Sequence, residues 1–252
     1  KPASAQPKKR LIVSIEGPEK TGKTHFALTG GGKTAVLNLD HGLEGVAPKF
    51  VGNGSDVQEV EYWLPDIVDP AKIEQKIVKA YESIWNQYFA DYKEALANFD
   101  TVLLDTGDEA WEMVRIARLG KLTQVMPNQY GPVNAEFRQI FNLAKQSNAN
   151  LLINHRMNDE YVNDKPTGRL KRAGFKNTAY EVQINLRSSK KGSDFQMQII
   201  DCRHDPDLDG KMIEPPTFER LQQMIFTNNN PTARKEATKW LTYQQFQTRL
   251  SR

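Results

Sequence analysis

The chain reads Leu11-Ile-Val-Ser-Ile15 and, one residue later, Gly17-Pro-Glu-Lys-Thr-Gly-Lys23-Thr24. The second stretch fits the pattern G-x-x-x-x-G-K-[ST], which is typical of a phosphate-binding loop when a strand precedes it and a helix follows. Its glycines let successive backbone N–H groups turn inward around a phosphate, and the positive end of the following helix points at the same anion. We expect a nucleotide to contact this loop and the residue after it, namely Gly17, Pro18, Glu19, Lys20, Thr21, Gly22, Lys23, Thr24 and His25.

Two side chains at the end of the loop carry the chemistry that the pattern predicts. Lys23 is expected to reach the β- and γ-phosphates as a mobile charge, and the hydroxyl of Thr24 is expected to ligate Mg²⁺. A chance match is the alternative, but the strand before the loop and the helical residues Phe26-Ala27-Leu28 after it argue against one. ATP is favoured over GTP by default, because the sequence contains no N-K-x-D motif for guanine.

Composition is consistent with one compact α/β domain, because 252 residues with 38% hydrophobic side chains can bury a sizeable core. The formal net charge of +3 neither demands nor excludes nucleic acid as a partner. The single cysteine, Cys202, cannot form an internal disulfide, and no apolar run approaches the roughly 20 residues that span a bilayer. We therefore expect a cytoplasmic protein without a membrane partner.

Apolar runs rich in β-branched residues alternate with helical patterns, which predicts a mostly parallel central sheet flanked by helices. Two alternating runs near the end, joined by Lys190-Lys-Gly192, predict a C-terminal antiparallel hairpin. Residues 1–10 are expected to be a disordered basic tail, 11–226 the core, and 227–252 a linker and last helix. The expected strands are 11–15, 34–39, 57–64, 100–105, 150–154, 180–187 and 195–200, and the expected helices are 69–92, 108–119, 132–146, 217–226 and 232–250.

Acidic and polar residues follow several of the expected strands. In an open α/β sheet ligands gather beyond the carboxyl ends of the strands, so Asp40, Asp105 and Asn154 or His155 should converge with Thr24. Asp105 is expected to hold a water of the Mg²⁺ shell opposite Thr24. The alternative is that this junction only caps the next helix. Asp40 has the chemistry to orient an attacking water, and Glu44 is the rival base.

Three stretches resemble the RecA-type recombinase core: Gly17-Pro-Glu of the loop, Gly32-Lys-Thr-Ala-Val-Leu-Asn-Leu-Asp40-His-Gly-Leu-Glu44, and Lys145-Gln-Ser-Asn-Ala-Asn-Leu-Leu-Ile-Asn154-His155-Arg156-Met157. The resemblance gives Asp40 the water-activating place usually held by glutamate, and His155 the γ-phosphate sensor place usually held by glutamine. A histidine with an ordinary pKa would change the pH dependence of turnover. Arg203 takes the place of a finger that acts on a neighbouring subunit, with Lys190 and Lys191 as weaker candidates.

The same resemblance implies two flexible DNA-binding segments. One lies around 122–134 and includes Gln129 and Tyr130. The other follows the sensor from 157 to about 177, and Arg156 comes directly before it. Cations in the second segment match phosphates, and Phe175 would stack on bases or wedge between them. A solvated polar loop is the alternative. The expected contacts there are Arg156, Lys165, Arg169, Lys171, Arg172, Phe175 and Lys176.

The resemblance covers residues 11–204, and the small size is most similar to phage-encoded RecA-type proteins classed as single-strand annealing ATPases. It implies a DNA-stimulated ATPase with ATP and Mg²⁺, assembled as a filament or ring in the cytoplasm of a bacterial host. Its expected partners are single-stranded DNA, further copies of the chain and a single-strand-binding protein, and its task is annealing or strand exchange. A translocating motor or helicase loader, a nucleotide or small-molecule kinase, and a binding module that barely hydrolyses ATP stay open as alternatives.

Overall fold

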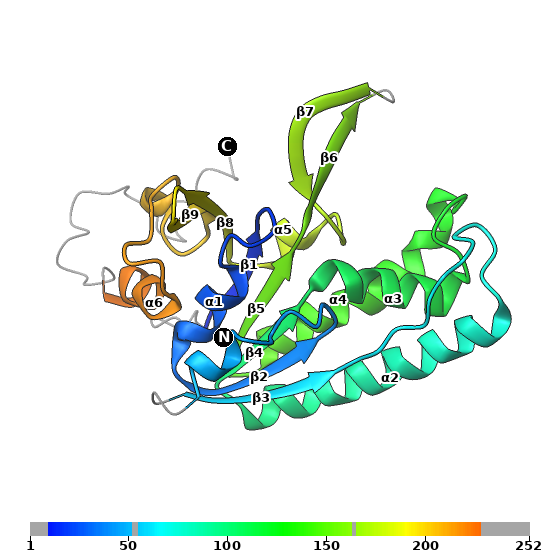
Figure 1. Cartoon of the computed structure of the whole chain (residues 1–252), viewed down its shortest axis with the longest axis horizontal. Helices are drawn as coiled ribbons and strands as arrows, with labels where there is room; N and C mark the ends of the chain where they lie inside the picture. Colours follow the sequence, from blue (N-terminus) through cyan, green and yellow to red (C-terminus); the bar gives the residue numbers. More distant parts are fainter. Residues whose placement is uncertain (1–9, 52–54, 163–164, 228–252) are drawn as a thin grey trace, which may run out of the picture.

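The computed structural model describes residues 10–51, 55–162 and 165–227. Its main sheet has seven strands in the order β3-β2-β4-β5-β1-β8-β9 (Figure 1). Every neighbouring pair is parallel except β8 and β9, which form an antiparallel hairpin. The strands are β1 (Ile12–Glu16), β2 (Gly32–Asn38), β3 (Ser55–Glu61), β4 (Thr101–Asp105), β5 (Asn150–His155), β8 (Ile184–Lys191) and β9 (Asp194–Cys202). The predicted fold class, a mostly parallel α/β sheet with a C-terminal antiparallel hairpin, is confirmed.

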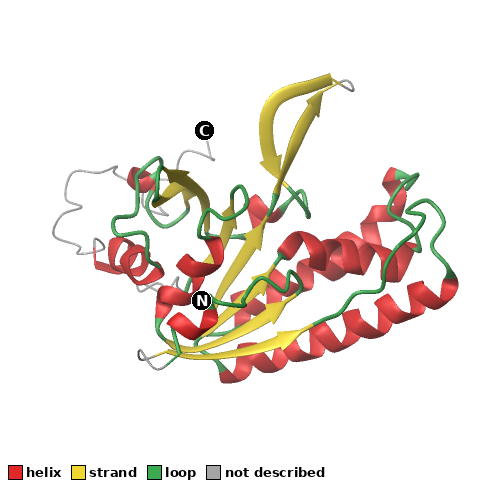
Figure 2. Ribbon diagram, in the orientation of Figure 1, coloured by secondary structure: helices red, strands yellow, loops and turns green. Residues whose placement is uncertain are grey.

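The sheet is covered by helices on both faces (Figure 2). One core forms under α2 (Gln75–Asn98), α3 (Gly107–Leu119) and α4 (Tyr130–Gln146). The other forms under α1 (Lys23–Ala27) and α6 (Phe218–Thr227). Because both faces are covered, β1 and β4 are buried along their whole length, which explains their unbroken apolar runs. The remaining short elements are η1 (Leu28–Gly30), η2 (Ala47–Lys49), η3 (Pro127–Gln129), α5 (Thr178–Glu181) and η4 (Pro206–Leu208).

The aromatic residues of α2 pack in the core, as their helical spacing predicts. Tyr81, Trp85, Tyr88 and Tyr92 are at most 4% exposed. The ring of Trp85 stacks on Tyr88 with a centroid separation of 5.9 Å. These rings hold α2 against the sheet and are not available to a ligand.

The second DNA-binding segment expected from the resemblance is not a loop. Two strands, β6 (Met157–Val162) and β7 (Lys165–Arg172), form a separate antiparallel pair that projects from the body of the molecule (Figures 1 and 2). We call this pair the arm. Its residues are exposed or half-buried on both faces. Neither strand shows the alternation of buried and exposed residues that marks a strand packed on a core.

Several element boundaries also differ from the prediction, most of all those of α2 and β8. The carboxylate of Asp69 accepts a hydrogen bond from the backbone of Ala71 at 2.8 Å and closes a turn, so α2 begins only at Gln75. Tyr180 lies in the short helix α5, and β8 starts at Ile184. The expected tail and last helix lie outside the described residues, apart from Arg10 and Thr227. Within the described ranges, no helix combines the length and apolar character needed to cross a membrane.

Candidate nucleotide-binding site

The phosphate loop connects β1 to α1 and is fixed by close packing against β8. Gly22 adopts φ 85°, a left-handed conformation that glycine tolerates, immediately before the helix starts at Lys23. Gly17 lies so close to Ser188 that any Cβ there would overlap the Ser188 side chain. The hydroxyls of Thr21 and Ser188 are hydrogen-bonded at 2.6 Å. These contacts hold the loop in place against β8.

Lys23 lies over the loop that precedes it. Its Nζ donates to the carbonyl oxygens of Gly17 at 2.9 Å and Pro18 at 2.8 Å. Burial lowers the pKa of Lys23, and the carboxylates of Asp105 and Asp40 oppose that shift. The ammonium group is therefore positioned where the loop would surround a phosphate.

Three side chains from α1, β4 and β5 meet beneath the loop. Thr24 Oγ1 donates to Asp105 Oδ2 at 2.7 Å, and Asn154 Nδ2 donates to Asp105 Oδ1 at 3.0 Å. Burial raises the pKa of Asp105, while the hydrogen bonds from Thr24 and Asn154 act in the opposite direction. Asn154 Oδ1 is buried and has no hydrogen-bond partner among the described residues. A hydroxyl, a carboxylate and a free amide oxygen fit Mg²⁺, which prefers oxygen ligands and retains several waters.

The junction after Asp105 also caps a helix, but a different residue does so. Thr106 Oγ1 accepts a hydrogen bond from the backbone of Glu109 at 3.5 Å, at the start of α3. Thr106 therefore caps α3, and its neighbour Asp105 pairs with Thr24. Capping by Thr106 leaves the carboxylate of Asp105 without a capping role, and its expected contact with Mg²⁺ stays a prediction.

Asp40 lies at the end of β2, beside Asp105. Its backbone N–H donates to the carbonyl oxygen of Asp105 at 3.2 Å, and to Asn38 Oδ1 at 3.1 Å. Its side chain is exposed, and its charge acts on both Asp105 and Lys23. Glu44 is also exposed, on the turn beyond the buried Leu43. Asp40 is thus the carboxylate that shares the electrostatic environment of the loop.

His155 is fully buried at the end of β5. Among the described residues, neither of its ring nitrogens has a hydrogen-bond partner. Burial, followed by the charge of Arg172, lowers the pKa of His155 to about 3. Burial thus holds the pKa of His155 well below that of an ordinary histidine, so the imidazole is neutral at neutral pH.

Gly107 is packed against His155, and this contact gives a prediction for stability. A Cβ at position 107 would overlap Ile153 and lie 2.9 Å from His155 Cε1. We expect Gly107→Ala to lower the free energy of unfolding by about 1–3 kcal/mol through overpacking. Gly131→Ala in α4, where nothing lies within 4 Å of the new Cβ, should change it by no more than about 1 kcal/mol. Urea denaturation of both variants measures the difference, and equal stabilities would contradict the packing argument.

Three residues expected to contact DNA instead contact other residues of the protein. Arg156 Nε donates to Asp108 Oδ2 at 2.6 Å, and although burial opposes it, this arginine lowers the pKa of Asp108. Arg172 donates to Ser14 Oγ at 3.0 Å. Phe175 is 2% exposed, with its ring centroid 5.2 Å from that of Trp111. Phe175 belongs to the core and cannot stack on bases, which corrects that expectation.

The other expected DNA contacts lie on the surface or near it. Lys165, Arg169 and Lys171 are exposed on β7, and Lys176 is exposed beyond it. Gln129 is exposed at the end of η3, where its Oε1 accepts a hydrogen bond from the backbone of Met126 at 3.0 Å. Tyr130 is half-buried, and its hydroxyl accepts from Arg115 at 3.2 Å.

Arg203 lies far along the sheet from the phosphate loop of its own chain. Its backbone N–H donates to the carbonyl oxygen of Gln183 at 2.8 Å, just before β8, whereas the loop follows the other end of β1. The opposite end of the hairpin is next to the loop, because a Cβ on Gly22 would lie 3.1 Å from the ring of Phe195. Lys190 Nζ lies 5.4 Å from the centroid of that ring. Arg203 therefore lies away from the phosphate loop of its own chain.

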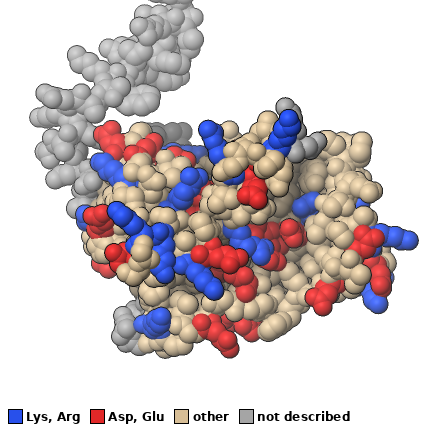
Figure 3. All heavy atoms as spheres, turned by 45° about the horizontal axis from the view of Figure 1, so that its top comes forward, with Lys and Arg blue, Asp and Glu red and all other residues tan. Residues whose placement is uncertain are grey.

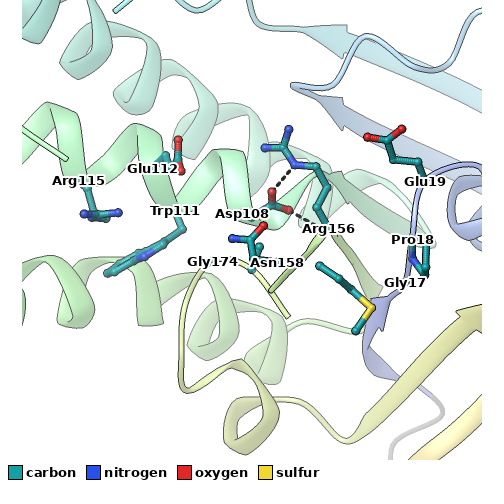
Figure 4. Close-up of a pocket in the computed structure, with 12 residues that line it drawn as sticks. Gly17, Pro18, Glu19, Asp108, Trp111, Glu112, Arg115, Arg156, Asn158 and Gly174 are labelled. Carbon is teal, nitrogen blue, oxygen red and sulfur yellow. Dashed lines mark hydrogen bonds and ion pairs between the residues drawn. The ribbon is translucent and has the colours of Figure 1, made fainter. Parts of the chain in front are cut away.

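A cavity of about 400 Å³ separates the phosphate loop from the arm (Figure 4). Pro18 and Glu19 line one side, Trp111 and Glu112 of α3 another, and Arg156 lies at the root of the arm. Sequence patterns did not indicate this arrangement. It depends on ion pairs between residues far apart in the chain, for which no local signal exists.

Comparison with known proteins identifies the family. A model of the family described as an AAA domain matches residues 9–195. The chain belongs to this family. The match includes the phosphate loop, Asp40, Asp105, His155 and the arm, and ends before Arg203. No curated protein sequence matches the chain.

Among solved structures, the crystal structure of the RadB recombinase is similar in fold. It shares 14% sequence identity and a TM-score of 0.45, with 80% of this chain and 84% of that chain covered. From the family match and the sheet topology, this AAA-domain protein is a P-loop ATPase with a mostly parallel α/β sheet.

Proposed function

We propose that this ATPase is a single-stranded DNA-binding recombination protein that promotes annealing or strand exchange. One observation carries the proposal: the exposed arm leaves the sheet directly after His155, beside the phosphate loop. DNA bound to the arm and ATP bound to the loop would then contact neighbouring parts of the protein. This subgroup assignment follows the resemblance to phage single-strand annealing ATPases.

ATP would bind with its phosphates on the loop and Lys23, and hydrolysis needs a water aimed at the γ-phosphate. The exposed carboxylate of Asp40 is our candidate to orient that water and accept its proton. Thr24, Asp105 and Asn154 would hold Mg²⁺, which when bound neutralises charge on the phosphates. The neutral imidazole of His155 is suited to donate or accept one hydrogen bond without adding charge.

The arm combines cations with exposed apolar side chains. Lys165, Arg169 and Lys171 are exposed, and Tyr161 and Leu170 are 57% and 46% exposed. Cations match the phosphates of a single strand, and apolar or aromatic side chains match its unstacked bases. Figure 3 shows acidic and basic groups interspersed over the face that contains the arm, so we expect DNA contact to be local.

We further propose that the protein works as a homo-oligomer, either a filament or a ring. The position of Arg203 supports this, because the arginine is exposed and lies away from its own loop. An arginine supplied by a neighbouring subunit would stabilise charge on the transferred phosphoryl group. A single-strand-binding protein is a further proposed partner.

The arm cations give the test of DNA binding. We expect the triple variant Lys165→Ala, Arg169→Ala, Lys171→Ala to bind single-stranded DNA at least about tenfold more weakly at moderate salt. The slope of log affinity against log salt should fall by about 2, because each lost phosphate contact contributes about 0.7. Fluorescence anisotropy of a labelled oligothymidine across a salt series measures both quantities.

A matched control separates the arm from overall charge. Lys76, Lys79 and Lys93 are exposed on α2, so their replacement by Ala removes the same charge elsewhere. We expect this control to bind DNA with nearly the wild-type slope. Equal losses in both variants would mean that the arm has no special role, and an unchanged arm variant would refute the proposed DNA site.

A further inference from the structure

Both ends of the arm are tied to the elements that carry the nucleotide site. The root is closed by a backbone hydrogen bond from Ala173 to the carbonyl oxygen of Arg156, at 2.9 Å. Met157 and Arg172 form the first pair of the two strands above it. The position of the arm is thus set by what holds Arg156 and Arg172.

Arg156 holds the first end against α3. It pairs with Asp108 Oδ2 at 2.6 Å (Figure 4). It also pairs with Glu109. Asp108 is buried and follows Asp105 by three residues. This pair connects the arm to the β4–α3 junction, where Mg²⁺ is expected.

Arg172 holds the second end against β1. Its Nη1 donates to Ser14 Oγ and to Asn185 Oδ1, at 3.0 and 2.8 Å, and lies 3.9 Å from Glu16 Oε2. Only 13% of the Arg172 side chain and 10% of the Glu16 side chain are exposed. Glu16 also pairs with Arg187 of β8. Because solvent screens such a pair only weakly, displacing either charge is costly.

Glu16 is the residue immediately before the phosphate loop, and the contacts of Lys23 show how nucleotide would affect it. In the structure Lys23 donates to the carbonyl oxygens of Gly17 and Pro18, directly next to Glu16. A triphosphate is a stronger acceptor for an ammonium group than a neutral carbonyl. Binding of the phosphates would therefore draw Lys23 away from the carbonyls that follow Glu16.

We propose that the Glu16–Arg172 ion pair transmits nucleotide occupancy from the phosphate loop to the arm. Arg172 is then a positioning residue for the arm, not a contact to DNA. Its hydrogen bonds to Ser14 and Asn185 hold the end of the second arm strand against β1 and β8. The inference rests on the proposed function, because it treats the arm as the DNA-binding element.

The test compares DNA affinity with and without a non-hydrolysable ATP analogue. For the wild-type protein we expect the analogue to tighten binding of a labelled oligothymidine by about tenfold, within the usual range of coupling. Glu16→Gln should reduce this ratio below about twofold, with affinity for the analogue in the absence of DNA nearly unchanged. Arg172→Gln, which leaves Glu16 paired with Arg187, should have the same effect and guards against misfolding of one variant.

Reciprocity gives a second readout, because DNA must change affinity for the analogue by the same factor. Arg187→Gln is the matched control: it removes the other partner of Glu16 without touching the arm, and should preserve the ratio. A wild-type ratio in both Glu16→Gln and Arg172→Gln would overturn the inference.

Amide hydrogen exchange separates this inference from the proposed function. The wild-type arm should exchange differently with and without the analogue even when no DNA is present, and Glu16→Gln should abolish that difference. If Glu16 only stabilised the fold, Glu16→Gln would raise amide exchange in the arm equally with and without the analogue. If wild-type protein binds no DNA, the proposed function fails, and the exchange data still decide the link: a nucleotide-dependent difference that survives in Glu16→Gln would overturn it.

Discussion

Replacing Lys23 by Ala is expected to lower ATP turnover by about two to three orders of magnitude. In the structure Lys23 lies over the loop, within the fields of Asp105 and Asp40. Its loss removes the mobile cation from the phosphates and leaves those two carboxylates facing the nucleotide without compensation. Release of inorganic phosphate measures turnover, and thermal unfolding without nucleotide should show that the fold is intact.

Lys33→Ala is the matched control, because Lys33 is exposed at the start of β2, at the opposite end of the sheet. It removes the same charge and should leave turnover near that of the wild type. Normal turnover by Lys23→Ala would mean that the loop does not bind the phosphates that are transferred.

Replacing Asp40 by Asn is expected to lower turnover by about two to four orders of magnitude while ATP binding persists. The amide keeps the size of the side chain but cannot accept a proton from water. Because the charge of Asp40 raises the pKa of Asp105, its removal should favour the ionised form of Asp105 and not weaken metal binding. Single-turnover hydrolysis and equilibrium binding of ATP separate the two effects.

Glu44→Gln is the comparison that decides the base. Glu44 is exposed on the turn beyond Leu43, and the structure favours Asp40, whose backbone is bonded to Asp105. We expect Glu44→Gln to retain most of the wild-type rate. The reverse result, with loss in Glu44→Gln and activity in Asp40→Asn, would transfer the role to Glu44.

Sequence reasoning predicted the parts of the fold that local patterns encode. The apolar run of β1, the loop glycines and the start of α1 form one continuous signal, and the structure places them as strand, loop and helix. Asp105 and Asn154 could be foreseen as neighbours because the carboxyl ends of parallel strands meet at one edge. The buried rings of α2 recur at helical spacing, a pattern that is visible in the sequence.

What sequence reasoning missed depends on contacts between distant residues. Arg172 donates a hydrogen bond to Ser14, 158 positions earlier in the chain. Its place in a basic stretch suggested a contact with DNA, whereas its partners lie within the protein. Phe175 packs in the core with residues of α3 and α4. The glycine and lysines next to it in the sequence instead suggested an exposed loop. The pKa of His155 reflects complete burial, and no single sequence displays burial at a strand end.

The central claim is that ATP hydrolysis on the loop responds to DNA on the arm. The most direct test measures ATP hydrolysis by the full chain with and without single-stranded DNA, at low and moderate salt, with Lys23→Ala as the blank. Our account predicts that DNA stimulates turnover, that stimulation weakens as salt rises, and that the blank shows none. ATP binding and hydrolysis that are indifferent to DNA at both salt concentrations would contradict it.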